Sequence, residues 1–171
     1  MTVVLARRDL FRGRLARPAK ARGLRPPTAI EEERFLAACD GCAACAPACP
    51  ETVIRHDGEH RPVLRFEHGE CTFCGACADV CEAGALVRVG VRDWTAKAEI
   101  SGKCLAIGGV HCRSCGDACP RSALRFQPRA DGRFLPVVVE DACNGCGACV
   151  APCPVDAVRV NERPEGRGEA A

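Results

Sequence analysis

Short apolar runs recur along the chain, each beginning just after a cysteine. The runs follow Cys49, Cys81, Cys119 and Cys153 and read PETVI, EAGAL, PRSAL and PVDAV. In each run, turn-forming or polar residues precede aliphatic ones, a pattern typical of one helical turn that enters a strand. The chain therefore predicts the same small unit four times.

Two longer stretches place apolar segments on both sides of a glycine turn. Residues 53–66 read VIRHDGEHRPVLRF, and residues 123–139 read ALRFQPRADGRFLPVVV. Apolar segments of β-type composition around such a turn favour a β-hairpin. Each hairpin lies between two cysteine-rich segments, so the two halves of the chain share one order of elements.

A short amphipathic helix is expected before the first cysteine. Pro26 and Pro27 end the preceding segment, and Thr28 with Glu31 forms a capping box. The apolar face of this helix would consist of Ile30, Phe35 and Leu36. We expect this face to pack against the first cysteine unit.

These patterns predict an α+β fold of two tandem units with short helices and hairpins. The link between the units is expected within residues 91–103, a charged stretch that contains Trp94. The polar, glycine-rich C-terminal tail is expected to be disordered. The predicted segments are a basic tail (1–27), a first unit (28–92), a second unit (93–160) and the C-terminal tail (161–171).

Composition indicates that cross-links stabilise this fold. The chain has 171 residues, of which 16 are cysteine, and it contains six Phe, one Trp and no Tyr. So few aromatic residues make a large apolar core hard to build, and small scaffolds then depend on disulfides or metal sites. The cross-link could be a disulfide, zinc or an iron-sulfur cluster.

The spacing of the cysteines separates these alternatives. The pattern C-x2-C-x2-C-x3-C occurs at 39–49, 71–81 and 143–153, and a fourth copy has seven residues, LAIGGVH, in its first gap (104–119). Zinc sites use paired C-x2-C knuckles and do not call for a third cysteine three residues later. The spacing therefore favours 4Fe-4S clusters over zinc or disulfides.

Three thiolates on one tight loop hold three corners of a 4Fe-4S cube, and a distant cysteine must complete it. In paired bacterial motifs the fourth cysteine of one motif ligates the other cluster. Four clusters are expected, and their predicted ligands are Cys39, Cys42 and Cys45 with Cys81; Cys71, Cys74 and Cys77 with Cys49; Cys104, Cys112 and Cys115 with Cys153; and Cys143, Cys146 and Cys149 with Cys119.

Small residues inside the motifs fit this assignment. Backbone N–H groups must turn inward to donate to cluster sulfurs, and bulky side chains would fill the space. These residues are Gly41, Ala43, Ala44, Gly75, Ala76, Gly116, Gly145, Gly147 and Ala148. The four histidines are expected to be solvated rather than ligands. No Ser-His-Asp set or phosphate-binding loop indicates a catalytic centre, so the chain is not expected to be an enzyme.

The charge is concentrated at the N-terminus. The chain has a net charge of +2, but residues 1–27 contain eight Lys or Arg and one acid. The remaining residues are therefore acidic, which disfavours nucleic-acid binding by the body of the protein. The basic tail is either a docking segment for an acidic partner or a solvated tail.

The Arg7-Arg8 pair raises the question of export, because such pairs mark bacterial proteins exported in folded form. A signal peptide needs an apolar segment of about 7 to 15 residues after its basic start, and none follows here. The longest uncharged run, residues 142–155, is too short to span a membrane. We therefore expect a cytoplasmic protein without a membrane span, in a compartment where disulfides are rare.

Several segments together resemble the NapF family of ferredoxin-type accessory proteins of periplasmic nitrate reductase. They are the basic RRDLFRGR opening, LRPP at 24–27, the helix before the first motif, the stretched third motif and the closing CNGCGACVAPCPVDA. The resemblance implies binding to the cytoplasmic precursor of the nitrate reductase catalytic subunit before export. It also implies help in assembling or reducing that subunit's iron-sulfur centre. Thr28 departs from the family pattern, in which an aromatic residue is expected.

Two other functions use the same cysteines. One is an electron-transfer subunit of a membrane-associated oxidoreductase, which would form a stable complex with catalytic and membrane subunits. The other is a redox or oxygen sensor, for which the chain has little room for an effector domain. Within the favoured function, the protein could pass single electrons or donate a labile third cluster.

Overall fold

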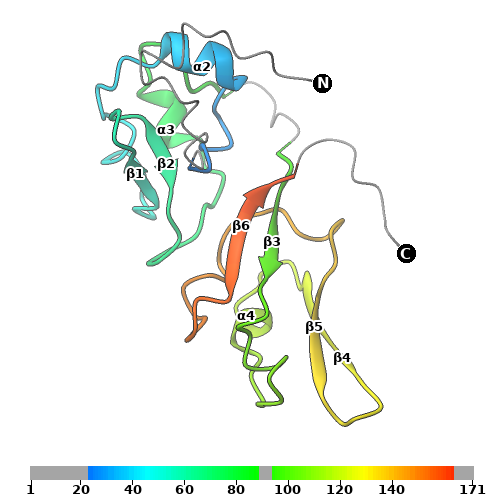
Figure 1. Cartoon of the computed structure of the whole chain (residues 1–171). Helices are drawn as coiled ribbons and strands as arrows, with labels where there is room; N and C mark the ends of the chain where they lie inside the picture. The colour runs from blue at the N-terminus through cyan, green and yellow to red at the C-terminus, as the bar shows by residue number, and fades with distance from the viewer. Residues whose placement is uncertain (1–22, 89–93, 164–171) are drawn as a thin grey trace, which may run out of the picture.

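The computed structural model describes residues 23–88 and 94–163 (Figure 1). This part of the chain contains short helices and strands joined by loops that carry the cysteines. Its strands form three two-stranded antiparallel sheets, β1–β2, β3–β6 and β4–β5. The elements are α2 (Glu32–Ala38), β1 (Ile54–His56), β2 (Pro62–Leu64), α3 (Ala76–Asp79), β3 (Ala96–Ile100), α4 (Ser114–Asp117), β4 (Leu124–Pro128), β5 (Phe134–Val138) and β6 (Val158–Glu162).

Both predicted hairpins are confirmed. Strands β1 and β2 pair with Ile54 opposite Leu64, and β4 and β5 pair with Leu124 opposite Val138. In both hairpins the first strand begins at a buried aliphatic residue, because the end next to the cysteines faces the interior. The hairpins therefore connect the two cysteine motifs of each half.

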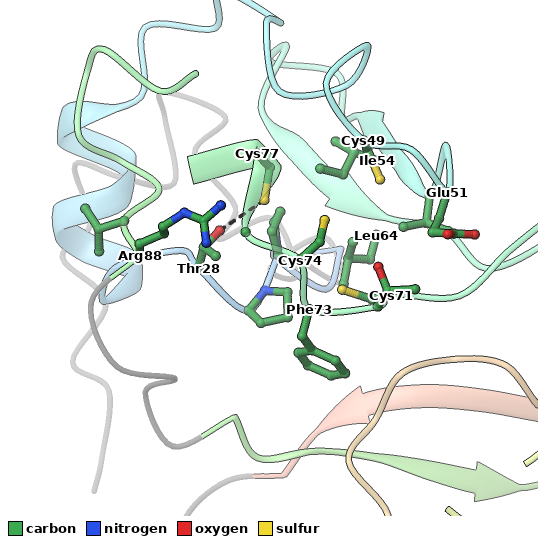
Figure 2. A pocket seen from close by; sticks show the side chains of 16 residues that line it. Thr28, Cys49, Glu51, Ile54, Leu64, Cys71, Phe73, Cys74, Cys77 and Arg88 are labelled. Atoms are coloured by element: carbon green, nitrogen blue, oxygen red, sulfur yellow. Dashed lines mark hydrogen bonds between the residues drawn. The ribbon is translucent and has the colours of Figure 1, made fainter. Parts of the chain in front are cut away.

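The helix before the first motif is present, but it begins later than predicted. Its N-cap is Glu31, whose carboxylate accepts bonds from the backbone N–H of Glu33 (3.1 Å) and Arg34 (3.3 Å). The predicted cap, Thr28, instead lies in a turn that the N–H of Ala29 closes onto the carbonyl of Pro26, and its hydroxyl lies beside Cys77 (Figure 2). The predicted capping box is therefore wrong, because Thr28 bonds to a distant sulfur rather than to the helix.

The segment expected to link the two units, residues 91–103, contains a strand. Residues 96–100 form β3, which pairs along its whole length with β6 at the end of the second unit. Ala96 and Ala98 are buried on one face, whereas the charged side chains of Lys97 and Glu99 alternate with them. Strand β6 also includes Asn161 and Glu162, so those two residues do not belong to the predicted disordered tail. The rest of that tail, from residue 164, lies outside the described residues.

Each of the four cysteine motifs ends in the same hydrogen-bonded turn. The carbonyl of the last cysteine accepts a bond, 3.0–3.4 Å long, from the backbone N–H three residues later. The four donors all have positive φ and are Thr52, Gly84, Ser122 and Asp156. A left-handed residue ends helical geometry. The chain therefore enters each following segment through a left-handed turn rather than through the predicted helical turn.

The end of the predicted basic tail packs against the first unit. Arg25 is only 8% exposed, and its guanidinium donates to Glu32 (3.2 Å), Asp57 (3.1 Å) and the carbonyl of Pro62 (3.0 Å). The same group lies over the Phe35 ring, 4.7 Å from its centroid. Residues 1–22 lie outside the described residues, and the boundary at residue 27 stays a prediction.

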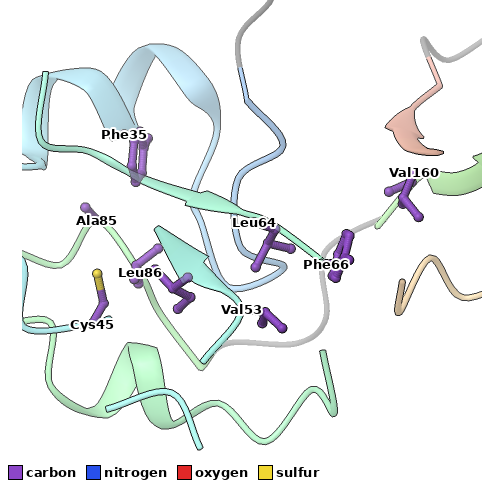
Figure 3. Close-up of a cluster of buried hydrophobic side chains, with 10 residues drawn as sticks. Phe35, Cys45, Val53, Leu64, Phe66, Ala85, Leu86 and Val160 are labelled. Carbon is purple, nitrogen blue, oxygen red and sulfur yellow. The ribbon is translucent and has the colours of Figure 1, made fainter. Parts of the chain in front are cut away.

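The main core cluster joins the two units. Phe66, which follows β2, belongs to the same buried cluster as Val160 of β6 (Figure 3). A side chain at Gly147 would place its Cβ 2.2 Å from the Phe66 ring, so this approach requires glycine. The backbone N–H of Cys71 donates to the carbonyl of Cys146 at 2.8 Å. The junction therefore connects the second cysteine motif directly to the fourth.

Trp94 packs at the same junction. Its ring meets the Phe73 ring edge-on, with centroids 6.3 Å apart. Among the described residues, no helix is long and apolar enough to cross a membrane.

Candidate metal centres

All sixteen cysteines lie within the described residues, and all are free thiols. Most are buried or half-buried, but the middle cysteines of the first two motifs, Cys42 and Cys74, are exposed. The thiols are therefore available as ligands, and two of the four motifs reach the surface.

Three pockets are each lined by four cysteines from two different motifs. In every case three cysteines come from one loop and the fourth ends the partner motif of the same half. The three sets are Cys39, Cys42, Cys45 and Cys81; Cys71, Cys74, Cys77 and Cys49; and Cys143, Cys146, Cys149 and Cys119. The fold thus brings together the cysteines that the crossed pattern groups. Ligation of iron by each sulfur stays a prediction.

The remaining four thiols belong to the stretched third motif and its partner. Cys104, Cys153 and Cys112 all lie close enough to Cys115 to act on it electrostatically. Beside Cys112 is a separate surface pocket, lined by residues of the LAIGGVH insertion and of the β4–β5 turn. The insertion therefore adds a surface pocket at the third motif, while Cys104, Cys112, Cys115 and the partner cysteine Cys153 stay near one another.

The loops of the three regular motifs share one backbone shape. In each, the second and fourth residues after the first cysteine have positive φ: Gly41 and Ala43, Phe73 and Gly75, Gly145 and Gly147. Alternation of left- and right-handed residues turns successive N–H groups to one side and forms an anion-binding concavity. The third motif differs, because its Cys112-to-Cys115 segment leads into helix α4.

Backbone N–H groups donate to the last cysteine of three motifs. The donors are Leu86 to Cys81 (3.3 Å), Ala123 to Cys119 (3.3 Å) and Ala157 to Cys153 (3.2 Å). Such bonds orient the sulfur and stabilise its charged form. Each donor follows one of the left-handed turns described above, so the turn serves to place the N–H at the sulfur.

Burial makes several thiols hard to ionise while no metal is bound. Burial, together with the neighbouring cysteines, raises the pKa of Cys45, Cys71 and Cys115 to about 11 and the pKa of Cys149 to about 12. These thiols are therefore protonated at neutral pH without a metal. Metal binding must displace their protons, so falling pH favours metal release.

One pocket has two polar neighbours that sequence analysis did not assign to a site. The Thr28 hydroxyl lies 3.2 Å from Cys77 Sγ, and Arg88 lies near Cys74 and Cys77 while it pairs with Asp79 (Figure 2). Burial raises the pKa of Cys77, and the Thr28 bond opposes that rise. Thr28 is 49 residues from Cys77, so no local pattern could have paired them.

The donor sets fit a cluster better than a single ion. Among the described residues, no three Cys, His, Asp or Glu side chains converge closely enough to hold one metal ion. A tetrahedral zinc site needs such convergence, with each sulfur about 2.3 Å from the ion. Four thiols instead line each of three pockets, which is the number of ligands that a 4Fe-4S cube needs.

Comparison with known proteins agrees with this geometry. A family model for the 4Fe-4S dicluster domain matches residues 38–85 and 110–157. The ferredoxin-type protein NapF of Escherichia coli K12 is 36% identical over 158 residues, which are 92% of this chain and 95% of that protein. This chain belongs to the NapF family of ferredoxin-type proteins. With two dicluster domains, this NapF-family protein carries four 4Fe-4S clusters.

Two other relatives match this NapF-family chain over most of their length. NapF of Haemophilus influenzae is 37% identical over 140 residues, 82% of this chain and 80% of that protein. The methylamine utilization ferredoxin-type protein MauM of Paracoccus denitrificans is 34% identical over an alignment of 175 positions, which covers 91% of this chain and 78% of that protein. The second dicluster match begins at residue 110, so Cys104 lies before it.

Proposed function

We propose that this protein binds the cytoplasmic precursor of the periplasmic nitrate reductase catalytic subunit and assists assembly or reduction of its iron-sulfur centre before export. The observation that carries the proposal is the likeness to NapF of Escherichia coli, which extends over 92% of the chain. The resemblance in the basic opening and the stretched third motif also supports it, because the regular cysteine motifs alone occur in many ferredoxins. In this role the protein is an accessory factor, not an enzyme.

The clusters, when bound, would accept and donate single electrons. The residues of the chain hold and shield them: four thiolates per site form the ligand sets, and N–H groups of Leu86, Ala123 and Ala157 stabilise the sulfur charge. The exposure of Cys42 and Cys74 gives two of the sites direct access to a partner surface. These features support electron exchange with another protein.

The third motif supports donation of a cluster as the alternative mode of assistance. Its first cysteine, Cys104, is separated from Cys112 by the insertion, and Val110 in that insertion is 54% exposed. Phe134, 44% exposed, lies beside it in the same surface pocket. These exposed apolar side chains offer an acceptor protein a surface to contact while a cluster is transferred.

The proposal is tested by anaerobic capture from cytosol. A tagged form of this protein should retain the nitrate reductase precursor, and deletion of its gene should lower nitrate reductase activity. A variant with Arg7, Arg8 and Arg12 changed to Gln keeps all sixteen cysteines, so its capture yield assigns docking either to the basic tail or to the described units.

Normal nitrate reductase activity in the deletion strain, with no precursor captured, would overturn the proposal. Capture of membrane and catalytic subunits in a stable complex would instead support the electron-transfer subunit. The exposure of Cys42 and Cys74, which suits electron exchange with another subunit, is the observation that keeps this second candidate.

A further inference from the structure

Thr28 is held in place by the backbone around it. The Thr28 carbonyl accepts a bond from the N–H of Val87 (2.8 Å), and Thr28 itself lies in a turn closed by a bond from the Ala29 N–H to the Pro26 carbonyl (2.9 Å). Two consecutive prolines, Pro26 and Pro27, fix φ in that turn. These contacts fix the backbone position of Thr28, and its hydroxyl lies 3.2 Å from Cys77 Sγ.

The chemistry of Cys77 fixes the direction of this hydrogen bond. A cysteine that ligates iron is a thiolate and has no proton to donate. The Thr28 hydroxyl has one proton and must then be the donor. The bond places the positive end of an O–H dipole on a ligand sulfur.

We propose that Thr28 raises the midpoint potential of the cluster held by Cys71, Cys74, Cys77 and Cys49. On reduction a cluster gains one electron, and its sulfurs become more negative. A donor to those sulfurs stabilises the reduced form more than the oxidised form, and hydrogen bonds to sulfur are one of the factors that set cluster potentials. The inference goes beyond the proposed function and rests only on the ligand assignment.

The other polar groups near the sulfurs do not replace this bond. Arg88 lies near Cys74 and Cys77, but its guanidinium is paired with Asp79, which offsets its charge. Among the described residues, the other hydroxyl with a hydrogen bond to a cysteine sulfur is that of Ser114, which lies 3.8 Å from Cys112 Sγ and so interacts more weakly. Thr28 therefore distinguishes its cluster from the other three.

The test is an anaerobic redox titration followed by EPR on the purified, fully loaded protein. Thr28→Val removes the hydroxyl at nearly constant volume, and Thr28→Ser keeps it. Thr72→Val is the matched control, because Thr72 lines the same pocket and no bond from its hydroxyl to a sulfur occurs among the described residues. Iron content is measured for every variant.

One cluster signal should titrate at a more negative potential in Thr28→Val, while Thr28→Ser and Thr72→Val should match the wild type. Unchanged potentials in Thr28→Val at full iron content would overturn the proposal. If Thr28→Val loses iron, Thr28→Ala is titrated in its place. Loss of iron from both, but not from Thr28→Ser, would also overturn it, because the hydroxyl would then be needed to retain the cluster. No partner protein takes part, so either result leaves the proposed function standing.

Discussion

At the scale of single residues, the fold depends on polar groups whose partners are distant in sequence. Arg25 reads as part of a basic tail, yet it is buried between helix α2 and the β1–β2 hairpin. Its guanidinium fork is satisfied by two carboxylates and one carbonyl, which is the condition for burying a charge. Sequence reasoning missed this residue because Asp57 is 32 positions away.

Arg25→Ala should lower the free energy of unfolding by about 2 to 3 kcal/mol, since it removes several charge-assisted hydrogen bonds and the packing on Phe35. The loss stays below that of a fully buried pair because Glu32 and Asp57 are partly exposed and can be solvated. Anaerobic guanidinium denaturation measures it. Arg65→Ala is the control, because Arg65 is exposed. A loss below about 0.5 kcal/mol, typical of surface sites, would contradict the burial of Arg25.

At the scale of elements, the sequence predicted those elements whose contacts are between residues close together in the chain. The two hairpins follow from residues 53–66 and 123–139, because strand and turn residues lie side by side in the sequence. Strand β3 could not be predicted in this way. Its buried face consists of Ala96 and Ala98, which give little apolar signal, and its partner strand β6 is about sixty residues away.

The left-handed turns, like strand β3, could not be predicted from local sequence alone. Gly84 is a recognisable turn residue, but Thr52, Ser122 and Asp156 occupy the equivalent position in the other motifs. Their positive φ is imposed by the hydrogen bond to the preceding cysteine carbonyl and by the strand that follows. Local residue preferences favour a helical turn here, because they do not include the hydrogen bond to the cysteine carbonyl.

Gly147→Ala tests the contact between the two units. The substitution adds a Cβ 2.2 Å from the Phe66 ring at a residue with φ of +87°, so clash and backbone strain should together cost about 2 to 4 kcal/mol. The expected result is a lower thermal midpoint of cluster loss. Gly102→Ala is the control, because nothing lies within 4 Å of a Cβ there. Equal midpoints for both variants would show that the units do not meet at Phe66.

At the scale of the whole molecule, the two halves repeat one design. In the second half β3 pairs with β6, and in the first half the Ala29–Leu86 bridge occupies the corresponding place. The spacing of the cysteines predicted this repetition and the grouping of the thiols. The contact of Cys71 with Cys146 could not be predicted from the sequence, because it depends on how two units that are distant in the sequence pack together.

The crossed grouping of cysteines into four 4Fe-4S clusters is the central claim. It is tested most directly by anaerobic iron and acid-labile sulfide analysis with EPR on the wild type, Cys104→Ser and Cys153→Ser. We predict about sixteen irons in the wild type and about twelve in each variant, with the same EPR signal missing from both. Loss of different signals in the two variants would contradict crossed ligation, and about twelve irons in all three proteins would contradict a cluster at the third motif.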